Sequence, residues 1–301
     1  MIYITQGHQK GVGLEIYIKS IICMNDDFSN KCILICYKES LIKTLSSLSL
    51  DYSLNKNSVL IGKKVIYCNF LTANKHSETT ECLLSSLNII SSKDFLITLP
   101  TSKDQLEYNG KQYNGYTEFL RSYFDKNITM NFLAANKNVS LLTDHIAIQD
   151  VPKILSKDFI VESLNTTLRS FPRKIKSIIF TGINPHAGES GLISADDNVI
   201  DDAIITLRKL HQNISFRGPL AGDTVHLSCS KNNNELIVYS YHDQGLSPFK
   251  LEFGLTGINL SLGLDFYRVS VDHGTAFEIY GKNIANYNGM IFLLNEVNRW
   301  A

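Results

Sequence analysis

The sequence predicts an α/β protein with a largely parallel sheet. Short runs of β-branched and other apolar residues alternate with amphipathic stretches along most of the 301 residues. This length corresponds to about two domains of typical size, or one large one. The 44% apolar content is enough for a full core, and no apolar run approaches the roughly 18 residues of a membrane span. We therefore expect a soluble globular protein.

The strands and helices are predicted from hydrophobic periodicity. Apolar runs rich in β-branched residues predict strands at Ile2–Thr5, Cys32–Cys36, Lys64–Cys68, Phe95–Leu99, Met130–Leu133, Val139–Leu142, Ser177–Thr181, Leu236–Tyr241, Ile258–Ser261 and Arg268–Val271. Apolar residues at helical spacing predict helices at Leu14–Met24, Thr80–Ile89, Tyr116–Phe124, Val151–Ser170, Asp196–His211, Ala276–Tyr280 and Ile284–Asn298. In Asp196–His211 the apolar side chains fall on one face, which predicts packing against a core.

The charge balance excludes some classes of partner. The chain has 29 Lys and Arg against 29 Asp and Glu, so it lacks the basic surplus typical of proteins that bind nucleic acid or anionic membranes. A local basic pocket for a small anion stays compatible with this balance. We expect neither nucleic-acid nor membrane binding.

The cysteines and the N-terminus indicate a cytoplasmic protein. Met1 leads directly into a strand-like run, without a basic or long apolar export signal. The one close cysteine pair, Cys32 and Cys36, has no second pair downstream. We therefore expect reduced, buried thiols rather than a zinc knuckle or a disulfide framework.

Three histidines follow predicted strands, where α/β proteins place their ligand sites. They are His145, His186 and His242, which lie 41 and 56 residues apart. One histidine at a strand end is usually a hydrogen-bonded structural residue. Three at equivalent places could instead be the ligands of a zinc-type ion with an open position for substrate, provided that the fold brings them together.

Two glycine-punctuated loops follow strands. The segments Gly182–Gly191 and Gly7–Gly13 could bring backbone N–H groups close to an anion, or could be turns that simply need glycine. The second is not a G-x-G-x-x-G motif and is weak as a dinucleotide signal.

Three polar residues near the C-terminus form a candidate anion clamp. Lys250, Asn259 and Arg268 are spaced about nine residues apart along strand-like and loop-like sequence. A Lys and an Arg, whose guanidinium can bind through two N–H groups, suit a phosphate or a carboxylate. The alternative is ordinary surface charge.

These segments carry a family resemblance. The matching stretches are Gly182-Ile-Asn-Pro-His-Ala-Gly-Glu, Gly218-Pro-Leu-Ala-Gly-Asp-Thr224, Tyr241-His-Asp-Gln-Gly-Leu246 ending at Lys250, Gly257-Ile-Asn-Leu-Ser-Leu-Gly-Leu264 and Ser270-Val-Asp-His-Gly-Thr-Ala276. Weaker matches are Gly11–Ile16, Gly115–Leu120 and Thr143–His145. In this order they resemble the 4-hydroxythreonine-4-phosphate dehydrogenase family of vitamin B6 (pyridoxal phosphate) biosynthesis.

The resemblance implies a function and an assembly. It implies oxidation of 4-phosphohydroxy-L-threonine with NAD or NADP and a divalent metal (zinc, magnesium or cobalt), followed by decarboxylation to 3-amino-2-oxopropyl phosphate. It also implies a homodimer with a shared active site. The implied fold is a two-lobed α/β/α protein, similar to isocitrate and isopropylmalate dehydrogenases. Residues 1–103 plus 265–301 would form the cofactor-side lobe, and residues 104–264 the metal, substrate and dimerisation lobe.

The resemblance also implies roles for individual residues. The metal ligands would be His145, His186 and His242, and the catalytic residues Asp223, as the candidate base, and Lys250. The substrate would be bound by Tyr116, Thr117, Lys250, Asn259 and Arg268. The cofactor's adenosine would be bound by His273, Gly274, Thr275, Ala276 and Asn286.

The sequence departs from the family at the substrate wall. A substrate-contacting His of the family is Tyr116 here, and a second His is Ser102. With an unperturbed pKa of about 10, a Tyr is a poor base near neutral pH but can donate a hydrogen bond. Two alternatives therefore stay open: a dehydrogenase of another 4-phosphorylated hydroxy acid, such as a threonate or erythronate phosphate, and a non-catalytic paralogue.

Overall fold

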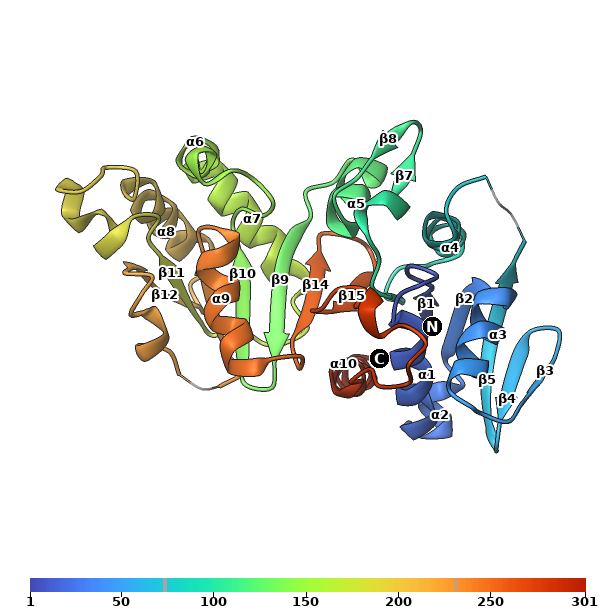
Figure 1. Cartoon of the computed structure of the whole chain (residues 1–301). Coiled ribbons are helices and arrows are strands. Elements are labelled where there is room, and N and C mark those ends of the chain that lie inside the picture. The colour runs from blue at the N-terminus through green and yellow to red at the C-terminus, as the bar shows by residue number, and fades with distance from the viewer. Residues whose placement is uncertain (73–74, 231) are drawn as a thin grey trace. The chain divides into compact units, whose positions relative to one another are not determined.

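The computed structural model describes residues 1–72, 75–230 and 232–301. The chain forms two compact units: Met1–Asp125 with Leu264–Ala301, and Lys126–Gly263 (Figure 1). We call them the first and the second unit. The roles expected for a cofactor-side and a metal-side lobe stay predictions.

The sheet of the first unit is parallel over most of its width. Its strand order is β15-β6-β1-β2-β5-β4-β3. Neighbours from β15 to β5 pair in parallel, whereas β4 and β3 are antiparallel. The strands are β1 (Ile2–Thr5), β2 (Cys32–Tyr37), β3 (Tyr52–Leu54), β4 (Ser58–Ile61), β5 (Lys64–Leu71), β6 (Phe95–Thr98) and β15 (Tyr267–Val271); β7 (Glu107–Tyr108) and β8 (Lys111–Gln112) form a separate hairpin.

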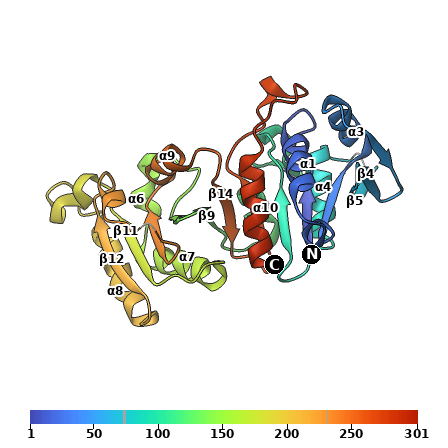
Figure 2. The same cartoon turned by 90° about the horizontal axis from the view of Figure 1, so that it is seen from below.

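Helices cover this sheet. Figure 2 shows α1 and α10 side by side, where they pack on each other, and α4 packs on β1 and β2. The helices are α1 (Gly13–Cys23), α2 (Asp26–Ser29), α3 (Lys38–Ser47), α4 (Glu78–Leu87), α5 (Tyr116–Phe124) and α10 (Asn288–Trp300), with the short 3-10 turns η1 (Lys103–Gln105) and η5 (Phe277–Ile279).

The sheet of the second unit has the order β12-β11-β13-β10-β9-β14. Pairs from β12 to β10 are parallel, and β9 is antiparallel to both of its neighbours. The strands are β9 (Thr129–Ala134), β10 (Lys137–Leu141), β11 (Ser177–Thr181), β12 (Ser215–Leu220), β13 (Glu235–Tyr239) and β14 (Ile258–Leu262). The helices are α6 (Val151–Ile154), α7 (Lys157–Ser170), α8 (Asn198–Leu210) and α9 (His242–Phe253), with the turns η2 (Ile148–Asp150), η3 (Pro185–Gly191) and η4 (Val225–Leu227).

Side-chain alternation places helices on both faces of this second sheet. Ile178 and Phe180 of β11 belong to the core shared with α7 and α8. Ile179, between them, belongs to the core shared with α9 on the opposite face. The apolar face predicted for residues 196–211 is confirmed, because Ile200, Ala203, Ile204 and Leu207 are buried in the first of these cores. The predicted α/β class with mostly parallel strands is also confirmed.

Several predicted elements need correction. The helix expected over Val151–Ser170 is two helices, because Ser156 caps a new one by accepting a hydrogen bond from the backbone nitrogen of Phe159. The helix expected at Ala276–Tyr280 shrinks to η5, since Ala276 is left-handed with φ 47°. The last helix starts at Asn288 rather than Ile284, where the Asn286 side chain accepts from the Asn288 nitrogen.

Two residue-level predictions also need correction. Lys250 lies in the last turn of helix α9, not in strand-like or loop-like sequence. The expected burial holds for Cys32, Cys36, Cys68 and Cys82, but Cys23 is exposed and Cys229 is half-buried.

Among the helices that the structure describes, none combines the length and apolarity needed to cross a bilayer.

Candidate active site

Four of the predicted residues of the second unit follow strands that end at the same edge of its sheet. His145 follows β10, His242 follows β13, His186 follows β11 and Asp223 follows β12. These are four consecutive, mutually parallel strands. Because the carboxyl ends of parallel strands meet at the same edge, the fold brings segments from distant parts of the sequence together there.

Two of the three histidines share a pocket. The ring centroids of His145 and His242 lie 5.5 Å apart, with the rings inclined by 37°. The pocket has a volume of about 150 Å³, and Asp144 and Asp243 also line it. The Asp243 carboxylate lies 2.7 Å from Nδ1 of His242, a contact that orients this imidazole.

His186 is placed on a loop of unusual backbone conformation. Residues 186 to 190 all have positive φ, between 47° and 73°. Only Gly188 among them lacks a Cβ, so the other four carry the steric cost of the left-handed region. His145 has a positive φ as well, 39°. Such conformations persist where the surrounding structure enforces them, which occurs often at functional sites.

A buried carboxylate holds this loop. Asp197, 2% exposed, accepts hydrogen bonds from the backbone nitrogen of Ile183 at 2.6 Å and from Nδ2 of Asn184 at 2.9 Å. A Cβ on Gly182 would lie 2.6 Å from Oδ1 of Asp197, and one on Gly188 2.8 Å from Oδ2. The two glycines therefore allow the loop to close around the carboxylate.

The side-chain amide of Gln244 links three of the segments at this edge. Its Oε1 accepts from Oγ1 of Thr181 at 2.8 Å and from the Ser240 nitrogen at 2.9 Å, and its Nε2 donates to the Gly182 carbonyl at 2.7 Å. A Cβ on Gly222 would lie 2.7 Å from Nε2, so the turn before Asp223 also packs here. Sequence analysis missed Gln244 and Asp197, although both lie within or beside the motifs that it singled out.

In the first unit, Arg268 and Tyr116 lie together. The Arg268 guanidinium carbon is 5.0 Å from the centroid of the Tyr116 ring. Nε and Nη2 of Arg268 donate to Oγ1 of Thr98 at 3.1 and 2.7 Å. The Tyr116 hydroxyl donates to the Leu99 carbonyl at 3.1 Å.

The residues predicted to bind the cofactor follow β15. Thr275 accepts a hydrogen bond from the backbone nitrogen of Val12 at 3.0 Å, so this segment lies against the loop before α1. Phe277, next to Ala276, meets the His8 ring edge to face at 4.7 Å. Burial lowers the pKa of His8, so its imidazole is predominantly neutral at neutral pH. His273 and Gly274 contact each other through Nδ1 and the carbonyl at 3.0 Å.

The remaining predicted residues differ in exposure. Lys250 and Asp223 are exposed, Asn259 on β14 is half-buried, and Thr117 on α5 is buried. Asn286 is exposed just before α10.

The histidine pair can supply two ligands to one divalent ion. Catalytic zinc sites use three protein ligands and keep one position open. Within the described residues, no group of three or more His, Cys, Asp or Glu side chains is close enough to hold a metal. The residues present thus fit part of the expected ligand set.

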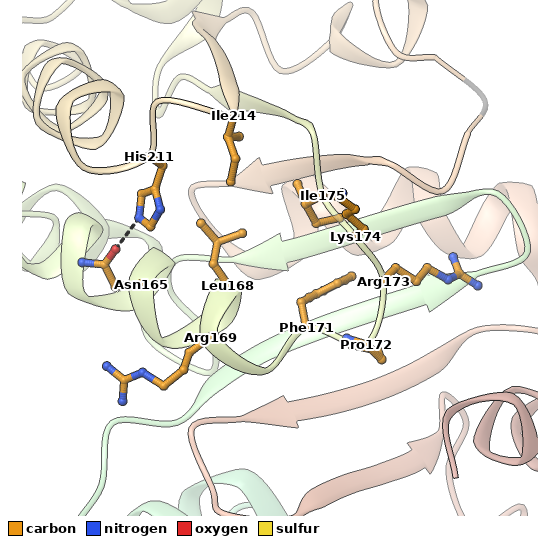
Figure 3. A pocket seen from close by; sticks show the side chains of 10 residues that line it. All are labelled: Asn165, Leu168, Arg169, Phe171, Pro172, Arg173, Lys174, Ile175, His211 and Ile214. Carbon is orange, nitrogen blue, oxygen red and sulfur yellow. Dashed lines mark hydrogen bonds between the residues drawn. The ribbon is translucent and has the colours of Figure 1, made fainter.

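A larger hollow of the second unit lies outside this site. It has a volume of about 660 Å³ and is lined by the end of α7 and the segments before β11 and β12 (Figure 3). His211 points to Asn165 there, with Nε2 2.7 Å from Oδ1. Since His211 lines a hollow that the predicted site residues do not share, it is a suitable control for histidine substitutions at the site.

Comparison with known families assigns the chain. The family model described as pyridoxal phosphate biosynthetic protein PdxA matches residues 53–295, most of the sequence. The chain belongs to this family. The predicted family and the predicted enzyme class are therefore confirmed.

Individual PdxA-family members agree with this assignment. A 4-hydroxythreonine-4-phosphate dehydrogenase of Sulfurihydrogenibium sp. is 31% identical over 303 residues, covering 96% of this chain and 86% of that protein. A protein of Bradyrhizobium diazoefficiens, provisionally named a D-threonate 4-phosphate dehydrogenase, is 34% identical over 223 residues, covering 68% of this chain and 64% of that protein. The crystal structure of a 4-hydroxythreonine-4-phosphate dehydrogenase from Burkholderia phymatum superposes with a TM-score of 0.74 at 25% identity, covering 100% of this chain and 98% of the other.

Proposed function

We propose that the chain catalyses the metal-dependent oxidation of 4-phosphohydroxy-L-threonine by NAD or NADP, with decarboxylation to 3-amino-2-oxopropyl phosphate. The observation that carries the proposal is the meeting of His145 and His242 at the sheet edge where His186 and Asp223 also emerge, in a chain of the PdxA family. We place this activity in the cytoplasm, in vitamin B6 biosynthesis.

The metal would be held by histidines of two subunits. His145 and His242 of one protomer fit two positions, and His186 of the partner subunit would be the third ligand in a homodimer with a shared active site. A bound zinc, magnesium or cobalt ion would lower the pKa of the substrate hydroxyl and stabilise negative charge on its oxygen.

The chain's own groups would handle the proton and the phosphate. Asp223 would take the proton of the substrate hydroxyl, and the carbon that bears this hydroxyl would give up a hydride to the nicotinamide when the cofactor is bound. The resulting β-keto acid would then lose carbon dioxide: the bond between the carboxylate and the α-carbon would break, and a proton would replace the carboxylate on that carbon, which keeps the electron pair. Thr117, Lys250, Asn259 and Arg268 would bind the substrate, with Lys250 also serving in catalysis. The adenosine of the cofactor would be bound by His273, Gly274, Thr275, Ala276 and Asn286.

A second candidate substrate is a 4-phosphorylated hydroxy acid of the threonate or erythronate type. The Bradyrhizobium protein carries a threonate phosphate in its provisional name. Tyr116 and Ser102 stand where the family has two histidines beside the substrate. These two replacements would change the shape and polarity of the substrate pocket. Catalysis on such a substrate would use the same metal and cofactor residues.

The test is to follow NADH or NADPH formation with each of the two substrates, before and after chelation and with zinc, magnesium or cobalt restored. We expect turnover with 4-phosphohydroxy-L-threonine that chelation abolishes and a metal restores. Turnover with a threonate phosphate alone would support the second candidate. No turnover with either, in protein that still binds zinc and NAD, would overturn both in favour of a non-catalytic paralogue.

A further inference from the structure

Tyr116 occupies a buried position under a buried arginine. Tyr116 is the first residue of α5 and is 8% exposed, while Arg268 on β15 is 3% exposed. The guanidinium carbon lies 5.0 Å from the ring centroid, within the range of an attractive cation–π contact. The hydroxyl of the same ring is hydrogen-bonded to the Leu99 carbonyl, which fixes the plane of the ring.

Neither Tyr116 nor Thr98 brings an opposing charge to Arg268. Both are with uncharged groups, the Tyr116 ring and Oγ1 of Thr98. Burial lowers the pKa of Arg268 to about 10, which still leaves the guanidinium protonated at neutral pH. A carboxylate in the position of Tyr116 would hold the arginine equally well but would cancel much of the charge that attracts an anion.

We propose that Tyr116 is a positioning residue, whose ring holds the Arg268 guanidinium ready for the phosphoryl group of the substrate. This inference rests on the proposed role of Arg268 as a phosphate ligand. It gives Tyr116 a task other than a hydrogen bond to substrate, because its hydroxyl already donates to Leu99. Burial also raises the pKa of Tyr116, so the group under the arginine stays neutral, whereas an imidazole in its place could acquire a repelling charge.

Two substitutions distinguish the contribution of the Tyr116 ring from that of its hydroxyl. Tyr116→Phe keeps the ring and should bind phosphate within about twofold of the wild type, whereas Tyr116→Leu removes it and should weaken binding about tenfold. With substrate, Tyr116→Leu should raise KM by a similar factor and leave kcat nearly unchanged, since phosphate binding is a remote, uniform interaction.

The experiment measures inorganic phosphate binding by calorimetry and substrate kinetics for these variants and for two controls. Tyr113→Leu removes another buried aromatic ring, which packs on Phe119 instead, and should bind phosphate like the wild type. Arg268→Leu tests the underlying assignment: unchanged phosphate binding in this variant would overturn the role of Arg268 in the proposed function. Weakened phosphate binding in Arg268→Leu together with wild-type binding in Tyr116→Leu would overturn the role of Tyr116 alone. A fall in kcat at constant KM in Tyr116→Leu would overturn it as well.

Discussion

The imidazole rings of His145 and His242 meet with their centroids 5.5 Å apart, although the two residues follow different strands of the second unit. β10 and β13 are parallel neighbours whose last residues, Leu141 and Tyr239, are paired in register. The short segments that follow these paired ends therefore emerge side by side. This relationship makes the zinc affinity of the pair directly testable.

Replacing either histidine should impair zinc binding. Zinc bound by two or three imidazoles loses one ligand in His145→Ala or His242→Ala, so we expect affinity to fall by on the order of 100-fold. Zinc titration of chelator-treated protein by calorimetry measures this. His211→Ala, which removes an imidazole bonded to Asn165, should bind zinc as the wild type does. Wild-type affinity in His242→Ala would show that the pair is not the metal site.

A shared site predicts complementation between two inactive variants. In a mixed dimer of His186→Ala and His242→Ala protomers, one site would combine His145 and His242 of the first with His186 of the second. Random mixing would then restore about a quarter of the sites. The measurement is dehydrogenase activity after the two proteins are unfolded together and refolded, with each refolded alone as the control. If each chain supplied all three ligands to its own site, the mixture would stay inactive.

Asp197 should stabilise the loop that carries His186. Its buried carboxylate accepts hydrogen bonds from Ile183 and Asn184, and hydrogen bonds to a charged group contribute about 1.5–3 kcal/mol each. We expect Asp197→Ala to lower the free energy of unfolding by about 3 kcal/mol, measured by urea denaturation. Asp196→Ala removes an exposed carboxylate that accepts a hydrogen bond from Oγ of Ser194, so its effect should stay below about 1 kcal/mol. Equal denaturation midpoints for the two variants would contradict this role.

The sequence was sufficient to predict ten strands and the polar residues that follow several of them, but it missed β3, β4, β12 and the short hairpin strands β7 and β8. The apolar runs that end near Leu141, Thr181 and Tyr239 clearly indicate strands, and ligand sites of α/β proteins lie just after such strands. Helix α9 was not predicted; it contains Gly245 and Pro248, two residue types of low helix propensity. In the fold, Gly245 serves close packing: a Cβ there would lie 2.8 Å from the Tyr239 ring. Gly245 is therefore needed for the close packing of α9 on Tyr239 rather than for a turn.

The hydrogen bonds between residues distant in the sequence could not be predicted from sequence patterns. Gln244 bonds to Thr181 and Gly182, and Asp197 bonds to Ile183. Nothing in the local spacing of an amide or a carboxylate specifies a partner on another strand. The same holds for the contact of Tyr116 with Arg268. The sequence showed that Tyr116 replaces a family histidine, but not that its ring packs against the Arg268 guanidinium.

Stability should decline at alkaline pH because of buried thiols. Burial raises the pKa of Cys32 from 9.0 to about 12, and it raises the pKa values of Cys36 and Cys82 as well. Between these two values the folded state binds more protons than the unfolded state, so stability falls as pH rises. The contribution of Cys32 is fully present below pH 9 and is lost as pH approaches 12. Its slope is about 1.4 kcal/mol per pH unit.

Urea denaturation at a series of pH values between about 8 and 10.5 measures this slope. Cys32→Ala should be less stable than the wild type near pH 8, because it leaves a small cavity, but should lose stability more slowly as pH rises. Cys23→Ala, which removes an exposed thiol, serves as the control and should follow the wild-type slope. Parallel slopes for Cys32→Ala and the wild type would show that ionisation of Cys32 does not limit alkaline stability.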